Sequence, residues 1–171
     1  MTQTQIDGAL RTRTYSWIDP AATFSALAGM SGIEMLSAMQ RGELPPPPVM
    51  QTLGMHAIEF REGLVRFGLE PGELHYNPLG TVHGGVIATM LDSATGCAVH
   101  SVLPAGTGYT SVDLTTKFLR PVTATTGHIT VTGTVLSRGG RTALAEAKLT
   151  DDDGRLLAYA TSTCLIFTLD T

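Results

Sequence analysis

The fold is decided by the 20 residues from His83 to Val102, which read HGGVIATMLDSATGCAVHSV. Most of them are apolar or small, and Pro104 follows shortly afterwards. A continuous apolar stretch of this length, stopped by a proline, predicts one long buried helix. Asp92 lies near its middle, and a carboxylate at mid-span argues against a helix that lies in lipid. We therefore expect this helix to be buried inside a water-soluble protein, with no membrane partner.

Both faces of this helix are apolar. At 100° per residue, one face is formed by Ile87, Met90, Ala94, Cys97 and Ala98. The opposite face is formed by Ala88, Asp92, Thr95, Gly96 and Val99. A helix that is apolar nearly all round must be buried all round, whereas one sheet covers only one side. We expect a second subunit on the other side, in a homodimer or in a homotetramer built as a dimer of dimers.

Strand-like segments flank the helix. Two precede it, at 53–60 and 64–69, and four follow it, at 109–119, 128–136, 142–150 and 156–167. Turns that contain glycine join them as hairpins, and hairpins pair strands antiparallel. A sheet with one apolar face needs a cover, which the long helix supplies. The sequence predicts an α+β fold, a curved antiparallel sheet wrapped around one central helix, in a single domain at 49–171.

Residues 1–48 are expected to form a helical extension in front of this domain. Asp19-Pro20 supplies an N-cap and a first-turn proline for a short helix through Phe24 and Leu27. The segment 31–34, Ser-Gly-Ile-Glu, forms a capping box that starts a second short helix. Four prolines close the extension and predict a stiff, extended linker.

Composition excludes several classes of protein. Of 171 residues, 43% are hydrophobic and 15% are charged, which excludes a disordered chain. The formal charge of −4 gives no electrostatic reason to bind nucleic acid. Cys97 and Cys164 lack CxxC spacing, and the five histidines are scattered without a chelating pair, so we expect no metal site. The N-terminal segment carries no export signal, which predicts a cytoplasmic protein.

One loop at the start of the helix has the residue types of a reactive site. Common catalytic signatures such as GxSxG, the Walker loop and HExxH do not occur in the sequence. Gly84 and Gly85 expose backbone N–H groups at the positive end of the helix dipole, which can polarise a carbonyl oxygen. His83 is expected to orient the loop, and Asn77 to form an Asx turn. Asp92, a costly buried carboxylate, is equally well interpreted as structural or functional.

The motifs in this part of the chain occur in a recognisable order. They are Asn77, His83-Gly84-Gly85, Asp92 nine residues after His83, Ser111-Val112-Asp113, the F-x-x-P at 118–121, Gly140-Arg141-Thr142 and the final Thr-Ser-Thr-Cys at 161–164. Together they closely resemble the phenylacetate-pathway type of hot-dog-fold acyl-CoA thioesterases, from about Pro45 to Phe167. The helix and proline run at 31–48 resembles that of a longer subgroup.

This resemblance implies a thioester hydrolase that acts on acyl-CoA without a cofactor. It implies that Asp92 is the general base or nucleophile and that the N–H of Gly84 or Gly85 is the oxyanion donor. Asn77 would help to bind the thioester or to position water. Active sites of the family form between two subunits, which agrees with the expectation drawn from the two apolar helix faces.

Other residues receive weaker assignments from the same resemblance. Ser111 would hold the attacking water, with Thr110 as a near competitor. Arg138, Arg141 and Thr142 would bind the coenzyme A moiety. The acyl group stays open between aryl-acetyl, hydroxybenzoyl and medium-chain fatty acyl.

Two alternatives compete with hydrolysis. A non-catalytic hot-dog module could bind acyl-CoA as a sensor, although such regulators normally carry a DNA-binding domain for which residues 1–48 are too short and insufficiently basic. A hydratase would need an Asp/His pair close together, whereas Asp92 and His83 lie on opposite sides of one helix.

Overall fold

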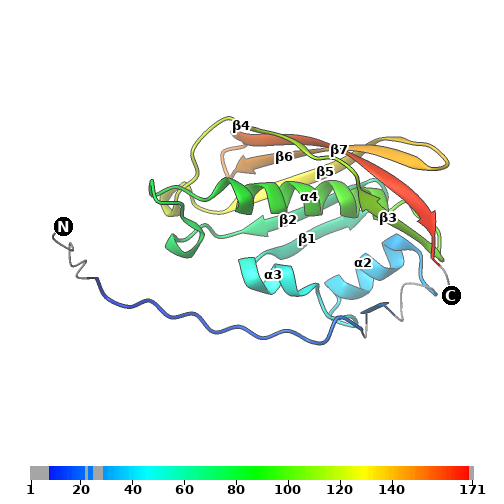
Figure 1. The fold of residues 1–171 in the computed structure, drawn as a ribbon, viewed down its shortest axis with the longest axis horizontal. Coiled ribbons are helices and arrows are strands. Elements are labelled where there is room, and N and C mark those ends of the chain that lie inside the picture. The colour runs from blue at the N-terminus through cyan, green and yellow to red at the C-terminus, as the bar shows by residue number, and fades with distance from the viewer. Residues whose placement is uncertain (1–7, 22, 25–28, 170–171) are drawn as a thin grey trace, which may run out of the picture.

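One sheet curves around one long helix in the computed structural model, which describes residues 8–21, 23–24 and 29–169 (Figure 1). The helices are α2 (Gly32–Gln40), α3 (Pro48–Leu53) and α4 (Gly84–His100), with short 3-10 turns η1 (Glu73–His75) and η2 (Ala124–Thr126). The strands are β1 (His56–Arg61), β2 (Leu64–Leu69), β3 (Thr107–Ser111), β4 (Thr115–Phe118), β5 (Ile129–Arg138), β6 (Thr142–Asp151) and β7 (Leu156–Thr168). The predicted α+β fold with a sheet wrapped around a central helix is confirmed.

The sheet is antiparallel throughout its seven strands. Its order is β1-β2-β5-β6-β7-β3, and β4 pairs separately with β7. Along β6 and the first five residues of β5 every second residue is buried, because successive side chains of a strand point to opposite faces. The buried face contacts α4, whose Met90, Leu91 and Ala94 have no exposed surface.

Glycine is required where α4 crosses the sheet most closely. A Cβ added at Gly133 on β5 would lie 2.1 Å from the carbonyl oxygen of Ala94 on α4. Helix and strand backbones therefore touch directly at this point, which a larger residue would prevent. The contact fixes the height of α4 above the sheet and so the position of every side chain that α4 presents.

The interpretation of the helix faces needs one correction. The face expected to meet the sheet does so, because Ile87 and Ala98 are also buried there. Thr95 and Val99, expected to face a second subunit, are instead fully buried within the chain. The sheet curls far enough round α4 to cover them, which a flat sheet could not do. Ala88 and Asp92 remain partly exposed.

Two strand predictions were wrong in their boundaries. The segment 109–119 is not one strand but β3 and β4, separated at residues 112–114. There the Asp113 carboxylate accepts the backbone N–H of Thr163 at 3.0 Å, replacing a strand-to-strand bond by a side-chain bond. The strand expected from residue 53 begins only at His56, since Leu53 belongs to α3.

The short helix α3 was missed in the proline run. Pro48 is its first residue, where a proline needs no N–H partner, and Gly54 ends it in the left-handed conformation at φ 76°. Pro45, Pro46 and Pro47 do stay outside any helix, as the linker prediction requires.

The extension packs on the rest of the chain. The predicted capping box is confirmed, since Ser31 accepts the N–H of Glu34 and Glu34 accepts that of Ser31. Leu36 of α2 is part of the main hydrophobic core. At the first predicted helix, Asp19 accepts the N–H of Ala21 at 3.0 Å, while Leu27 lies outside the described residues.

No helix in the described ranges combines the length and the apolar character needed to span a membrane.

Candidate active site

Asp92 and Ser111 meet where β3 ends beside the middle of α4. The Ser111 hydroxyl donates to Oδ1 of Asp92 at 2.9 Å, across 19 residues of sequence. Asp92 lies on the side of α4 that the sheet leaves partly exposed. Ser111 is held in register by pairing with Cys164 of β7. The fold thus brings together two residues that the sequence could link only through a resemblance.

The loop after Ser111 is fixed by a second carboxylate. Asp113 accepts the N–H of Thr163, and Ser162 donates to the carbonyl oxygen of Asp113 at 2.8 Å. The hydrogen bonds from Thr163 lower the pKa of Asp113, so this exposed carboxylate stays charged and keeps its bonds. Asp113 therefore positions the end of β3, and with it the Ser111 hydroxyl.

A largely apolar cavity of about 320 Å³ opens beside Asp92, and we call it the Asp92 cavity. Its lining comes from the proline run and α3 (Pro47, Val49, Met50), from β2 (Phe67), from α4 (Asp92, Ser93, Gly96, Cys97) and from β3 (Tyr109, Thr110, Ser111). Asp92 is the one carboxylate among these residues. A pocket that is mostly apolar with a few polar groups at one wall is the usual form of a small-molecule site.

The inner end of the Asp92 cavity is uncharged at neutral pH. Burial raises the pKa of the Cys97 thiol to about 12, and burial also raises the pKa of Tyr109 well above its ordinary value. A thiol with a raised pKa is a poor nucleophile, because the thiolate is the reactive form. The ionisable group that faces a bound molecule here is therefore the carboxylate of Asp92.

Hydrogen bonds at the start of α4 leave one of the two glycines free to act on a ligand. His83 is the N-cap, and its Nδ1 accepts the N–H of Gly85 at 2.9 Å. The carbonyl oxygen of His83 accepts from Val86 and Ile87. The expectation of two free donors is thus wrong for Gly85, and in the described part of the chain the N–H of Gly84 is the donor left over.

Asn77 holds the turn that leads into this helix. Its Oδ1 accepts from the backbone of Leu79 and Thr81, and its Nδ2 donates to the Thr81 hydroxyl at 2.9 Å. Gly80 completes the turn at φ 77°. The predicted Asx turn is confirmed.

The helix start and Asp92 open into different cavities. Asn77 and Gly84 line a cavity of about 350 Å³ together with Phe118 and Val122, which we call the Asn77 cavity, and Asp92 is not part of it. Eight residues of helix separate Gly84 from Asp92, a rise of about 12 Å. A reacting carbonyl sits within about 3.5 Å of its nucleophile, so one chain cannot present both groups to the same bond.

Comparison with known proteins identifies the family. A sequence profile of the thioesterase superfamily matches residues 79–158. The match contains His83, Gly84, Asp92 and Ser111. Asn77 and most of β7 lie outside it. A crystal structure from Ralstonia eutropha JMP134, described as that of a thioesterase related to phenylacetic acid degradation, is 33% identical. It superposes with a TM-score of 0.69 over 75% of this chain and 97% of its own. The chain belongs to the thioesterase superfamily. The resemblance drawn from the motifs is thereby confirmed.

Three further relatives of this thioesterase-superfamily chain differ in how much of their length the chain covers. Mouse acyl-coenzyme A thioesterase 13 is 36% identical over 93 residues, which are 53% of this chain and 64% of the mouse protein. A Halobacterium salinarum protein is matched over 53% of its length. The chain therefore spans between about half and two thirds of the length of these two curated relatives. The PaaI protein of the E. coli phenylacetic acid degradation operon, 21% identical with a TM-score of 0.69, covers 83% of this chain and 100% of its own, and supports the hot-dog fold.

In this thioesterase-superfamily chain, the residues expected to bind coenzyme A lie at the tip of the β5–β6 hairpin. Arg138, Arg141 and Thr142 are all exposed there. Thr142 and Thr110 both pair with Leu165 of β7, so they lie in one row across the sheet, two strand spacings or about 10 Å apart. The hairpin tip thus stands at the same level of the sheet as the end of β3.

Sequence reasoning missed three residues that shape this site. Met50 was hidden because α3 was interpreted as a linker, although proline at its start and glycine at its end were readable signals. Tyr109 was counted as a strand residue, and no local pattern shows that its ring closes a cavity against Gly96. Asp113 was noted only as part of a motif, without its positioning bonds.

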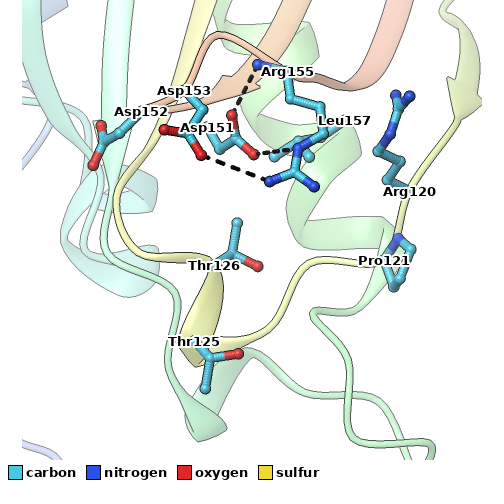
Figure 2. A pocket seen from close by; sticks show the side chains of 9 residues that line it. All are labelled: Arg120, Pro121, Thr125, Thr126, Asp151, Asp152, Asp153, Arg155 and Leu157. Atoms are coloured by element: carbon cyan, nitrogen blue, oxygen red, sulfur yellow. Dashed lines mark hydrogen bonds and ion pairs between the residues drawn. The ribbon is translucent and has the colours of Figure 1, made fainter.

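Another cavity, of about 440 Å³, lies at the turn between β6 and β7, shares Arg120 and Pro121 with the Asn77 cavity, and is lined largely by charged side chains (Figure 2). Asp151 in it is buried and accepts from both the backbone and the guanidinium of Arg155, at 2.8 and 3.0 Å. A buried carboxylate that is paired in this way holds a turn together. We assign this cavity no part in the reaction.

Proposed function

We propose that the protein hydrolyses an acyl-CoA thioester to the free acid and coenzyme A. Membership of the thioesterase superfamily supports the reaction class. The observation that carries the proposal is the hydrogen bond between Ser111 and Asp92 at the wall of an apolar cavity. A carboxylate with an adjacent hydroxyl, facing a largely apolar pocket, can hold and activate one water beside a bound carbonyl.

The reaction follows from these groups. The acyl part of the substrate occupies the Asp92 cavity, and a water held by Ser111 attacks the thioester carbon while Asp92 accepts its proton. The tetrahedral intermediate collapses by breaking the carbon–sulfur bond, and coenzyme A leaves as a thiolate. Direct attack by the Asp92 carboxylate, through an anhydride that water then opens, is the other form of the same proposal. Neither form requires a cofactor.

The oxyanion donor comes from a second copy of the chain. Gly84 has a free N–H at the positive end of a 17-residue helix, but about 12 Å of helix separates it from Asp92. The uncovered stripe of α4 around Ala88 and Asp92 is the surface on which a twofold-related partner would place its own helix start. We propose a homodimer with two such composite sites, with Asn77 holding the turn that aims Gly84.

The cavity favours compact acyl groups. At about 320 Å³ it lies at the small end of ligand pockets, and Met50 and Tyr109 bound it. Aryl-acyl and medium-chain acyl groups fit this description, and long-chain acyl groups do not. Arg138 and Arg141 at the exposed hairpin tip would meet the phosphates of coenzyme A.

Coenzyme A release from a panel of aryl and aliphatic acyl-CoAs, followed with a thiol reagent, tests the proposal. We expect turnover of at least one compact acyl-CoA, lost in Asp92→Asn. Tight binding of acyl-CoA by calorimetry without turnover of any substrate would instead establish a non-catalytic binding module.

A further inference from the structure

Two histidines far apart in sequence meet on the outer face of the sheet. His56 opens β1, and His128 precedes β5, 72 residues later. Both flank β2, because His56 pairs with Gly68 and Gly68 pairs with Thr130. The Nε2 atoms of the two rings are 3.3 Å apart, and the ring centroids are 5.3 Å apart. Scattered histidines argued against a metal site in the sequence, and the strand pairing removes that objection.

These distances fit two ligands of one metal ion. With Zn–N bonds of about 2.0–2.1 Å and a tetrahedral angle, two imidazole nitrogens lie roughly 3.3–3.4 Å apart and their ring centroids roughly 5.2 Å apart. The contact also meets the geometry of a hydrogen bond between one protonated and one unprotonated ring nitrogen, which a bound ion would replace. In either case the two Nε2 atoms approach each other closely enough to share one ion.

Gly68 makes the convergence possible. A Cβ at this position would lie 2.4 Å from the Nε2 atom of His56 and 2.4 Å from that of His128. Any other residue at position 68 would therefore push the two rings apart. The missing side chain leaves a space that both ligand atoms border.

A carboxylate supports the second histidine from behind. Oδ1 of Asp152 lies 3.5 Å from Nδ1 of His128. Figure 2 shows that Asp151 and Asp153 turn towards Arg155, whereas Asp152 points away from it. A carboxylate on the far nitrogen of a metal-ligating histidine orients the ring and raises its basicity.

We propose that His56 and His128 bind a borderline divalent transition-metal ion of the Zn(II), Co(II) and Ni(II) class. The described residues contain no cluster of three or more metal-ligating side chains, so water fills the remaining positions. Leu69 of β2 pairs with Ile129, so the next residue, Glu70, lies opposite His128. Glu70 is an exposed carboxylate on the same outer face of the sheet as the two histidines. The ion would fasten the edge strand β1 to β5 across β2. This site is independent of the proposed hydrolysis.

Titration of the tag-free 171-residue chain with Co(II), followed by absorption, tests the proposal. We expect saturation at one ion per protomer, and at least a tenfold loss of affinity in His56→Asn and in His128→Asn. Gly68→Ala keeps both ligands but displaces the flexible ring ends, and it should weaken binding by a similar factor. Asp152→Asn should lose roughly tenfold. The matched control is His83→Asn, which removes the other exposed histidine and should leave binding unchanged.

A measurement on the unmutated chain guards against variants that fold poorly. Zn(II) should shift the Nε2 resonances of His56 and His128 together in nitrogen NMR spectra and should raise the melting temperature. The proposal is overturned by non-saturable binding, by wild-type affinity in His56→Asn, His128→Asn or Gly68→Ala, by a comparable loss in His83→Asn, or by unshifted resonances.

Discussion

The start of α4 and its middle illustrate two ways in which a chain positions a reactive group. At the start, His83 and Asn77 form short-range hydrogen bonds, all within five residues, and these leave Gly84 with a free N–H. In the middle, Asp92 meets Ser111 only because β3 returns beside the helix 19 residues later. The first arrangement is local and the second is tertiary. Mutations at the two places should therefore have different effects. Those at the helix start test the oxyanion donor, and those in the middle test the base or nucleophile.

The largest effect should come from the middle of the helix. Asp92→Asn keeps the shape of the side chain and an oxygen for the Ser111 hydroxyl, but removes the base or nucleophile. We expect kcat to fall by about 10²–10⁴-fold, with an unchanged melting temperature. Steady-state coenzyme A release measures this, and a normal kcat would exclude Asp92 from the chemistry. Single turnover in ¹⁸O-water can establish direct attack, because label enters the Asp92 carboxylate only when water opens an anhydride at the Asp92 carbonyl, whereas general-base catalysis labels only the product acid.

The helix start should give the next largest effect. Gly84→Pro removes the N–H while proline is well tolerated at the first helical position, after a residue with the extended ψ of 135° seen at His83. We expect about a 10²–10³-fold loss of kcat. Gly84→Ala is the matched control, since it adds a similar contact with Phe118 at 3.3 Å but keeps the N–H. Equal loss in both variants would show that packing, rather than the donor, matters.

Mixing these two defects tests whether the site is shared. If Asp92 and Gly84 of different subunits form one site, a mixed dimer of Asp92→Asn and Gly84→Pro chains contains one intact site. Random re-association should then recover roughly a quarter of wild-type activity, because about half of the dimers are mixed. Activity that stays at the level of the separate variants would place both groups in one subunit's site.

Removing the partner of Asp92 should have a smaller effect. Ser111→Ala deletes one hydrogen bond to a charged group, which is worth about 1.5–3 kcal/mol, and we expect kcat to fall roughly 10–100-fold. Thr110→Ala serves as the comparison, because Thr110 also lines the cavity without bonding Asp92 in the structure. A larger loss in Thr110→Ala would transfer the water-holding role to that residue.

The smallest effect concerns selectivity. Met50→Ala enlarges the Asp92 cavity from the α3 side, and we expect a shift of kcat/KM towards longer acyl chains of roughly five- to tenfold, the low end of the roughly 1–3 kcal/mol that a methylene is worth in an apolar pocket. Competition between two acyl-CoAs of different length measures the ratio directly. An unchanged ratio would mean that the acyl group does not reach α3.

Sequence reasoning succeeded where one physical constraint dominates a short segment. The apolar run of α4, the capping box at Ser31 and the turn at Asn77 each follow from local chemistry, and all are present in the structure. Sequence reasoning did not predict contacts that depend on how the chain folds back on itself. Nothing near Thr95 or Val99 shows how far the sheet curls, and nothing near Gly85 shows that the ring of His83 folds back to accept its N–H.

The acyl side of the proposed site is enclosed by α3, the shortest of the three helices α2, α3 and α4. Helix α3 has six residues, none of them fully buried, and its last carbonyls are bonded by the exposed Arg13 at Gln51 and Thr52 and by the buried His75 at Leu53. A helix this short is marginal without its neighbours. We therefore expect the wall that limits acyl size to open locally at a lower free energy than the unfolding of the whole chain, while α4 keeps Asp92 fixed. The length of acyl chain that the site accepts thus depends on a different segment from the one that carries the catalytic carboxylate.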